Sequence, residues 1–179
     1  VKASQAKILA NKEVQDIIKC LGAGSGSNFD MDKLRYGRVF IASDADPDGA
    51  NIAALIVALF WTLFKPFVQA GRLYRLVTPL FVIKTKEGKK SRHLYAETSQ
   101  EKDNIVAKLE AKKIKYTISR LKGLGESTPE VMNETGMNPE TRKVVRVIVD
   151  DDKAAENMHE TVLGTDVSIR KKWIQDNPI

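Results

Sequence analysis

Three aspartates, Asp44, Asp46 and Asp48, lie within five residues of one another and directly follow an apolar segment at residues 39–42. Carboxylates packed this closely repel one another and cost stability unless a cation neutralises them. Hard oxygen ligands in a short turn suit Mg²⁺, which binds one or two carboxylates and keeps waters that a phosphate can replace. Alternate residues after a strand share a face, so Asp44 and Asp46 are expected to point into one site, with Asp48 at the turn and Gly49 relieving the backbone. The sequence therefore predicts a Mg²⁺ site here.

Two other interpretations of the aspartates fit less well. Acidic runs in turns are most often simply solvated, but the preceding strand pattern and the following glycine make that interpretation weaker here. A calcium-binding EF-hand loop also begins Asp-x-Asp-x-Asp-Gly. Its twelfth position should supply a bidentate Glu and its eighth should be apolar, yet these positions are Leu55 and Asn51. The segment before the aspartates also resembles a strand rather than a helix, so we reject the EF-hand.

A second segment with chemical potential is Lys122-Gly123-Leu124-Gly125-Glu126, which follows a strand pattern at residues 116–121. Its two glycines allow the backbone to approach a ligand closely, and Lys122 offers a point charge for a phosphate. The spacing is not that of a P-loop, so no nucleotide site is predicted.

The elements around these segments predict an α/β fold. A buried strand pattern at 39–42 leads through the acidic turn into an apolar helix at 50–64 that Pro66 should stop, and ligand sites in such folds lie at the carboxyl ends of strands. A helix over residues 12–21 should begin at the N-cap Asn11 and end at Gly22. Further expected elements are extended structure at 73–84 bent at Pro79, a hairpin tip at 87–90, a helix from a Thr98 capping box to about 113, and the strand at 116–121.

Beyond residue 126 the pattern changes to a mainly helical tail. Helices are expected from Thr128, from Pro139, from Asp152 to Gly164, and over a last segment containing Trp173, with one strand at 144–149. We therefore predict a metal-binding core at residues 1–126 and a mainly helical tail at residues 127–179.

Composition sets limits on the class of protein. The chain has 179 residues, of which 42% are hydrophobic, and its formal net charge is +6. This excludes a mostly disordered chain and favours an acidic partner such as nucleic acid. No apolar run reaches the roughly 18 residues of a membrane span. The single cysteine, Cys20, excludes a disulfide framework and a cysteine-based zinc site, fits a reducing, cytoplasmic location, and is expected in the core. Because the first residue is Val, we expect a piece of a longer chain.

Other residues carry weaker signals. His93 and His159 lack metal-ligand spacing and are expected at the surface or in packing. The hairpin tip carries Lys89, Lys90 and Arg92, for which a solvated turn and a DNA-backbone contact are both open. The basic run at residues 170–172 could bind DNA or a partner protein.

Taken together, these motifs resemble the Toprim domain and the tail of the B subunits of bacterial or phage type IIA DNA topoisomerases. The resemblance covers essentially the whole chain in order. It is carried by Ile41-Ala42-Ser43-Asp44-Ala45-Asp46-Pro47-Asp48-Gly49, Lys33-Leu34-Arg35-Tyr36-Gly37, Pro79-Leu80-Phe81, Lys122-Gly123-Leu124-Gly125-Glu126, residues 134–142 and residues 170–174.

The resemblance implies a Rossmann-like parallel-sheet core that holds Mg²⁺ for DNA cleavage and religation. Asp44 and Asp46 would be metal ligands, Asp48 a nearby support, and Lys122 a catalytic residue that contacts the DNA phosphate. The implied partners are double-stranded DNA, an A subunit that supplies the attacking tyrosine, and the ATPase region upstream in the B subunit; no membrane is implied.

Some features of that family are altered or lie elsewhere. Its Glu-Gly-Asp-Ser motif, which carries the catalytic Glu and the first Toprim strand, does not occur in these residues, so the site is expected to be completed by other sequence. Asn51, Thr78 and Asn138 replace a His, a Pro and an Asp. The subtype stays open among gyrase, topoisomerase IV and a phage enzyme. Alternative functions are the Toprim domain of a primase or nuclease, and a non-catalytic docking module.

Overall fold

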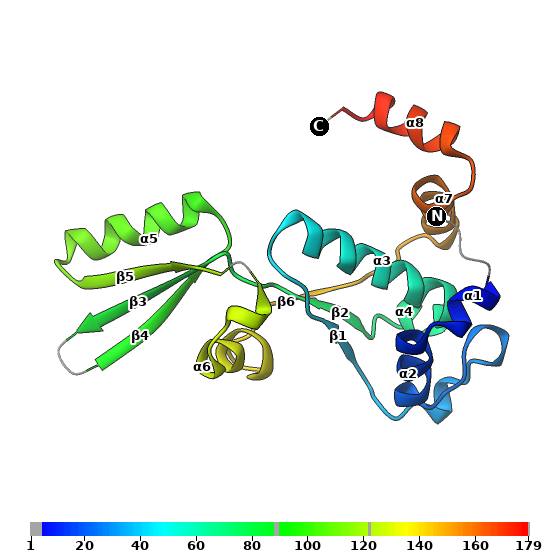
Figure 1. Cartoon of the computed structure of the whole chain (residues 1–179), viewed down its shortest axis with the longest axis horizontal. Helices are drawn as coiled ribbons and strands as arrows, with labels where there is room; N and C mark the ends of the chain where they lie inside the picture. The colour runs from blue at the N-terminus through cyan, green and yellow to red at the C-terminus, as the bar shows by residue number, and fades with distance from the viewer. Residues whose placement is uncertain (1–4, 88–89, 122, 179) are drawn as a thin grey trace. The chain divides into compact units, whose positions relative to one another are not determined.

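The computed structural model describes residues 5–87, 90–121 and 123–178, and within them the chain is mixed α/β (Figure 1). The chain divides into two compact units. One comprises Val1–Arg38, Ala58–Arg72 and Val147–Ile179, and the other comprises Val39–Val57 and Leu73–Arg146. In the described part of the chain, no helix has the length and apolar character that a membrane crossing requires.

The first unit is helical. Its core is aromatic: the Phe64 ring lies 5.1 Å from Phe60 and 5.5 Å from Phe29 between centroids, and Phe64 is completely buried. Such tilted and edge-on contacts are the arrangements that aromatic rings prefer. The helices are α1 (Gln5–Ala10), α2 (Lys12–Leu21), the end of α3 (Pro47–Leu63), α4 (Lys65–Gln69), α7 (Asp152–Leu163) and α8 (Val167–Asp176).

Helix α2 confirms the expected caps. The side chain of Asn11 accepts a hydrogen bond from the Val14 N–H at 3.0 Å, and Gly22 ends the helix in the left-handed region at φ 71°. Cys20 is exposed, so its expected core position is wrong. The physical reason is the helical period: the buried stripe contains Val14 and Leu21, and position 20 lies outside it.

Helix α3 starts earlier than expected, at Pro47, and ends at Leu63. Pro66 does not simply stop this helix, because it lies in the first turn of the next one, α4. A proline is accommodated there, since the first turn of a helix has no intrahelical partner for its N–H groups.

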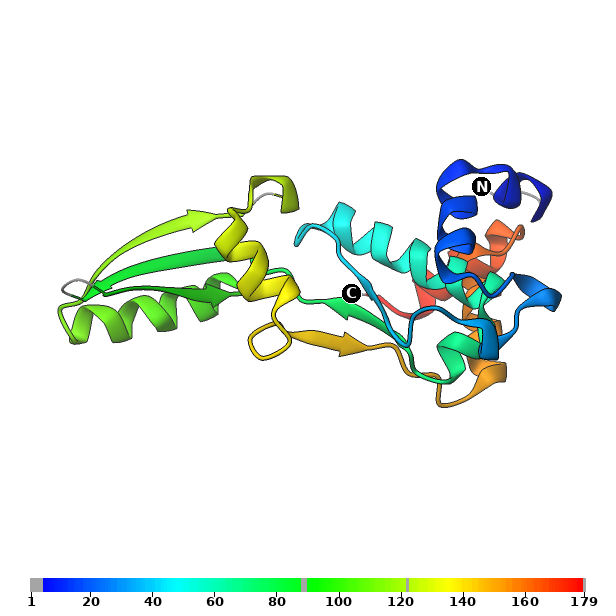
Figure 2. The same ribbon diagram turned by 90° about the horizontal axis from the view of Figure 1, so that it is seen from below.

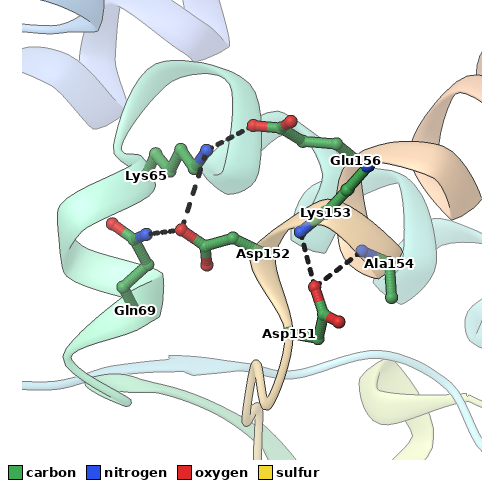
Figure 3. A network of polar contacts seen from close by, with 7 residues as sticks. All are labelled: Lys65, Gln69, Asp151, Asp152, Lys153, Ala154 and Glu156. Carbon is green, nitrogen blue, oxygen red and sulfur yellow. Dashed lines mark hydrogen bonds and ion pairs between the residues drawn. The ribbon is translucent and has the colours of Figure 1, made fainter.

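Polar side chains join α4 to α7 within this unit (Figure 3). Lys65 Nζ lies 2.5 Å from Glu156 Oε1, and Gln69 donates to Asp152. The Glu156 carboxylate raises the pKa of Lys65 above its ordinary value. The N-cap of α7 is Asp151, which accepts from the N–H groups of Lys153 and Ala154 at 2.8 and 3.0 Å, so the helix is capped one residue before the expected Asp152.

The second unit contains two three-stranded sheets. In the first sheet β1 (Val39–Ile41) pairs in parallel with β2 (Leu73–Leu76), with Val39 opposite Leu73. The parallel pairing confirms the α/β expectation, since parallel neighbours need a crossover, here begun by α3. β6 (Val144–Arg146) adds to β2 antiparallel and is shorter than the strand expected at 144–149.

The second sheet is antiparallel, in the order β4-β3-β5, with β3 at Phe81–Glu87, β4 at Lys90–Ala96 and β5 at Lys115–Arg120. The pairing of β3 with β4 confirms the expected hairpin. Helix α5 (Ser99–Ala111) covers one face (Figures 1 and 2), where Ile83, Ala96 and Leu109 form a buried cluster. The Thr98 cap is confirmed, because the Glu101 N–H donates to Thr98 Oγ1 at 3.1 Å. The Glu101 carboxylate accepts from the Glu97 N–H at 2.7 Å, one residue before the N–H expected in a capping box.

The segment after residue 126 is less helical than expected around Pro139. α6 (Pro129–Met132) runs on into a π-helical turn at Asn133–Met137, and the helix expected from Pro139 is a turn instead. Asn138 explains the difference, because its side chain accepts from the Glu140 N–H at 3.0 Å. Asparagine side chains that bond the backbone two residues on form turns that compete with helix.

Candidate functional site

The three aspartates occupy the connection from β1 to α3. Ile41, the last residue of β1, is buried and fixes the start of this loop. Asp46 is the N-cap of α3: its Oδ1 accepts from the Gly49 N–H at 2.7 Å, and its carbonyl oxygen accepts from the Ala50 N–H at 3.0 Å. Asp48 lies in the first turn of the helix, where a carboxylate is favoured by the helix dipole.

Gly49 is required by a close backbone approach. A Cβ at this position would lie 2.1 Å from the carbonyl oxygen of Asp44 and 2.8 Å from its nitrogen. Gly49 is helical, so the reason is steric and not the backbone freedom that the sequence suggested. The loop folds back on the first turn of α3, and only glycine leaves room for it.

The Asp44 side chain meets the second motif. Its Oδ1 accepts from the backbone N–H of Leu124 at 2.8 Å, across 80 positions of sequence. A Cβ on Gly123 would lie 3.3 Å from Asp44 Oδ2, so a larger residue there would crowd the carboxylate. Lys122, the third residue expected here, lies outside the described residues.

Two further contacts hold these loops, and the motifs did not reveal them. The Thr78 hydroxyl donates to the Ser43 carbonyl oxygen at 2.7 Å, which ties the residue before Asp44 to the segment after β2. The Leu121 N–H donates to the Leu80 carbonyl oxygen at 2.9 Å. Thr78 stands where the resemblance implies a proline, and its hydroxyl supplies a bond that a proline lacks.

The carboxylates differ in their availability. Asp44 and Asp48 are exposed and Asp46 is half-buried. Among the described residues, no group of three or more acidic, His or Cys side chains is arranged to hold a metal ion. In the contacts of the described residues, Asp44 and Asp46 each accept a hydrogen bond through Oδ1. Their carboxylate oxygens nevertheless match the donor set that Mg²⁺ takes from proteins. The residues present therefore fit this ion with one or two direct ligands.

The expected DNA contacts are not part of this cluster. Arg92 is exposed on β4 and pairs with Thr85 of β3, which in turn pairs with Tyr116 of β5. This row of paired residues is four positions along β5 from Arg120, the last residue of that strand. At about 3.4 Å per residue, that row is roughly 14 Å from the strand end that leads to Asp44. Lys89 lies outside the described residues, and Lys90 is described only as the first residue of β4.

Three titratable side chains, those of Tyr95, His93 and Glu134, lie together, and the sequence did not predict this cluster. The Tyr95 hydroxyl donates to Glu134 Oε2 at 2.5 Å, and His93 Nδ1 lies 3.4 Å from the same oxygen. Burial first, and then the Glu134 carboxylate, raise the pKa of Tyr95 well above its ordinary value. Tyr95 and His93 are two residues apart on β4, so their side chains point to the same face of the sheet. Their contacts with Glu134 join the sheet to the segment after α6. His93 therefore has the packing role expected of it.

Comparison with known proteins agrees with these features. Residues 1–76 match the Toprim domain family, and residues 112–175 match the family described as DNA gyrase B subunit, carboxyl terminus. The B subunit of DNA gyrase from Thermotoga maritima is 42% identical over 174 residues, which are 97% of this chain and 26% of that protein. The B subunit of DNA topoisomerase 4 from Staphylococcus aureus is 40% identical over the same shares of both chains. The chain thus spans about a quarter of the length of these curated relatives.

The strand, acidic turn and helix, together with the first family match, define the class: the chain carries a Toprim domain. The second match and the relatives give the narrower group. The chain belongs with the B subunits of the type IIA DNA topoisomerases, of which it has the Toprim and carboxyl-terminal regions.

Proposed function

We propose that this chain supplies the aspartates of a Mg²⁺ site with which a type IIA topoisomerase cleaves and rejoins double-stranded DNA. The observation that carries the proposal is the hydrogen bond from the Leu124 N–H to Asp44 Oδ1. It joins the acidic loop to the Lys-Gly-Leu-Gly-Glu segment, so that a carboxylate and a loop suited to phosphate lie together.

Each residue has a separate task in this proposal. Asp44 and Asp46 are the metal ligands and Asp48 supports them with its charge, while the N–H groups of Leu124 and Gly49 orient the two ligand carboxylates. When bound, Mg²⁺ supplies electrostatic stabilisation to the phosphate and to the oxygen that leaves it. Lys122, which adjoins Gly123 in sequence, contacts the same phosphate.

The partners in the proposal follow from the relatives, which are named as B subunits of gyrase and of topoisomerase 4. An A subunit provides the tyrosine that attacks DNA, and an ATPase region elsewhere in the B subunit drives the change in topology. Arg92 on β4, together with Lys89 and Lys90, which precede it in sequence, contacts the DNA backbone.

A DNA cleavage assay tests the proposal. The chain, joined to the upstream Glu-Gly-Asp-Ser segment and mixed with an A subunit, should cut DNA only with a divalent ion. Asp44→Asn keeps an oxygen for the Leu124 N–H but removes the charge, and should lower cleavage roughly a hundredfold, about 3 kcal/mol of lost stabilisation. Asp16→Asn, on the exposed side of α2, is the matched control. Undiminished cleavage by the Asp44 variant would refute the assignment.

A second candidate is a docking module without a metal. It is favoured by the lack of a three-carboxylate arrangement among the described side chains and by exposed apolar residues of α7 and α8, including Met158, Trp173 and Ile174. Calorimetric titration with Mg²⁺ separates the two functions. Heat that disappears in Asp46→Asn, a substitution that preserves the N-cap, supports the metal site, and a heat-free titration supports docking.

A further inference from the structure

One end of the β4-β3-β5 sheet is crowded with lysines. Lys86 on β3 lies directly opposite Lys115 on β5. The turn from α5 to β5 adds Lys112 and Lys113, and all four side chains are exposed. Figures 1 and 2 agree that this turn lies at the same end of the sheet as the end of β3 and the start of β4. We call these four residues the lysine surface.

Two features of the lysine surface oppose folding. The pair Lys86 and Lys115 places like charges opposite each other on neighbouring strands, which is destabilising. Lys113 has φ 55°, in the left-handed region. Its N–H donates to the Glu110 carbonyl oxygen and the Ile114 N–H donates to that of Leu109, both at 2.9 Å, which is the helix-ending motif whose left-handed position glycine normally occupies.

No carboxylate offsets this charge in the described structure. None of the four lysines forms an ion pair there, whereas Lys33, Lys65 and Lys143 each lie within 3.0 Å of an acidic oxygen. The acidic residue nearest in sequence to Lys112 and Lys113, Glu110, accepts instead from the Tyr116 hydroxyl at 2.8 Å. The lysine surface is thus a concentration of unneutralised positive charge at a place where it costs stability.

We propose that the lysine surface binds the phosphate backbone of double-stranded DNA. Lysines act as flexible point charges toward phosphate, and a row of them neutralises successive phosphates without reading sequence. Binding a polyanion also removes the repulsion between Lys86 and Lys115. The partner rests on the proposed function, which already has DNA as substrate, but the surface lies away from the aspartates and needs no metal.

The test is binding of the whole 179-residue chain to a fluorescent DNA duplex, followed by anisotropy in EDTA over a range of salt concentrations. Each lost phosphate contact lowers the slope of log affinity against log salt by about 0.9. Lys112→Gln with Lys115→Gln should therefore lower the slope by about 1.8. The control, Lys12→Gln with Lys153→Gln, makes the same change of net charge on α2 and α7 and should leave it unaltered.

Lys113→Gly separates binding from stability. It should raise the thermal midpoint by about 2–4 °C, because glycine adopts the left-handed conformation freely, and lower the salt slope by about 0.9. A merely structural lysine would show the first change without the second, which counts against the proposal.

Other outcomes overturn the proposal outright. One is no measurable binding of DNA, and another is an equal loss of salt slope in the lysine-surface and control variants. A third is a lysine-surface variant that keeps its DNA affinity and loses affinity for fluorescent poly-L-glutamate, which would assign the surface to an acidic protein. Because the assay contains EDTA, it is independent of the metal site.

Discussion

Gly49→Ala tests the packing that holds the acidic loop. In an ordinary helix this change stabilises by about 1 kcal/mol. Here the new Cβ would lie 2.1 Å from the Asp44 carbonyl oxygen, whereas real Cβ atoms do not come within 3.0 Å of other atoms, so the Asp44 backbone must move by about 0.9 Å (3.0 less 2.1 Å). Overpacking of this kind costs about 1–3 kcal/mol or somewhat more, and the shift also weakens the bond from the Leu124 N–H, worth about 1–2 kcal/mol.

The net expectation is a loss of about 1–4 kcal/mol, or roughly 3–12 °C in the thermal midpoint of a chain of this size. Calorimetry or far-ultraviolet circular dichroism is the suitable readout, because Trp61 and Trp173 both lie in the other compact unit. Gly125→Ala is the matched control, since a Cβ there meets no atom within 4 Å. An alanine at position 49 that is as stable as the parent would refute the close approach.

Three further predictions concern single side chains. Asp46→Ala should lower the free energy of unfolding by about 1 kcal/mol through the lost cap, while Asp46→Asn should not; equal denaturation curves for the two variants would contradict the cap. The raised pKa of Tyr95 means that its neutral phenol stabilises the fold below about pH 10, and that this contribution is lost as the pH rises from there through the higher folded-state pKa. As the pH rises from about 9.5 to 11.5, the free energy of unfolding should therefore fall less in Tyr95→Phe than in the parent. Urea titrations at each pH can show this difference. Cys20 should react with a thiol reagent in the folded chain as fast as in urea, and protection of this residue would contradict its exposure.

Features set by local chemistry were predictable from the sequence. The caps at Asn11, Gly22 and Thr98 follow from bonds between near neighbours, and the structure has all three. The strand, acidic turn and helix at residues 39–63 were also expected, because a short apolar run followed by carboxylates, a glycine and a long apolar segment favours this order of elements.

Contacts between distant segments, and local interactions that compete with one another, were not predictable. Nothing near Gly49 in sequence shows that Asp44 folds back against it, and nothing near Asp44 points to Leu124 or Thr78. The turn at Asn138 was missed because a side-chain bond competes with a helix that Pro139 would otherwise favour. Cys20 was misplaced because it lies outside the buried stripe of α2, which contains Val14 and Leu21.

Parts of the site remain predictions. The roles of Lys122 and Lys89 concern residues outside the described chain, and the division at residue 126 between core and tail is not tested by the grouping into compact units. The sequence did place Asp44 at the end of a strand, but it did not show that Asp46 also serves as a helix cap. That double role is why Asp46→Asn, rather than alanine, separates metal binding from folding.

Asp44 and Asp46 are proposed to hold a divalent ion, and Mn²⁺ titration of the ¹⁵N-labelled chain measures this most directly. Mn²⁺ takes the same oxygen ligands as Mg²⁺ and broadens nearby amide signals. The signals of Gly49 and Leu124 should broaden first, and excess Mg²⁺ or the Asp44→Asn change should prevent it. Broadening that begins instead at Asp151 and Asp152 of α7, or that is unchanged by Asp44→Asn, would contradict the account.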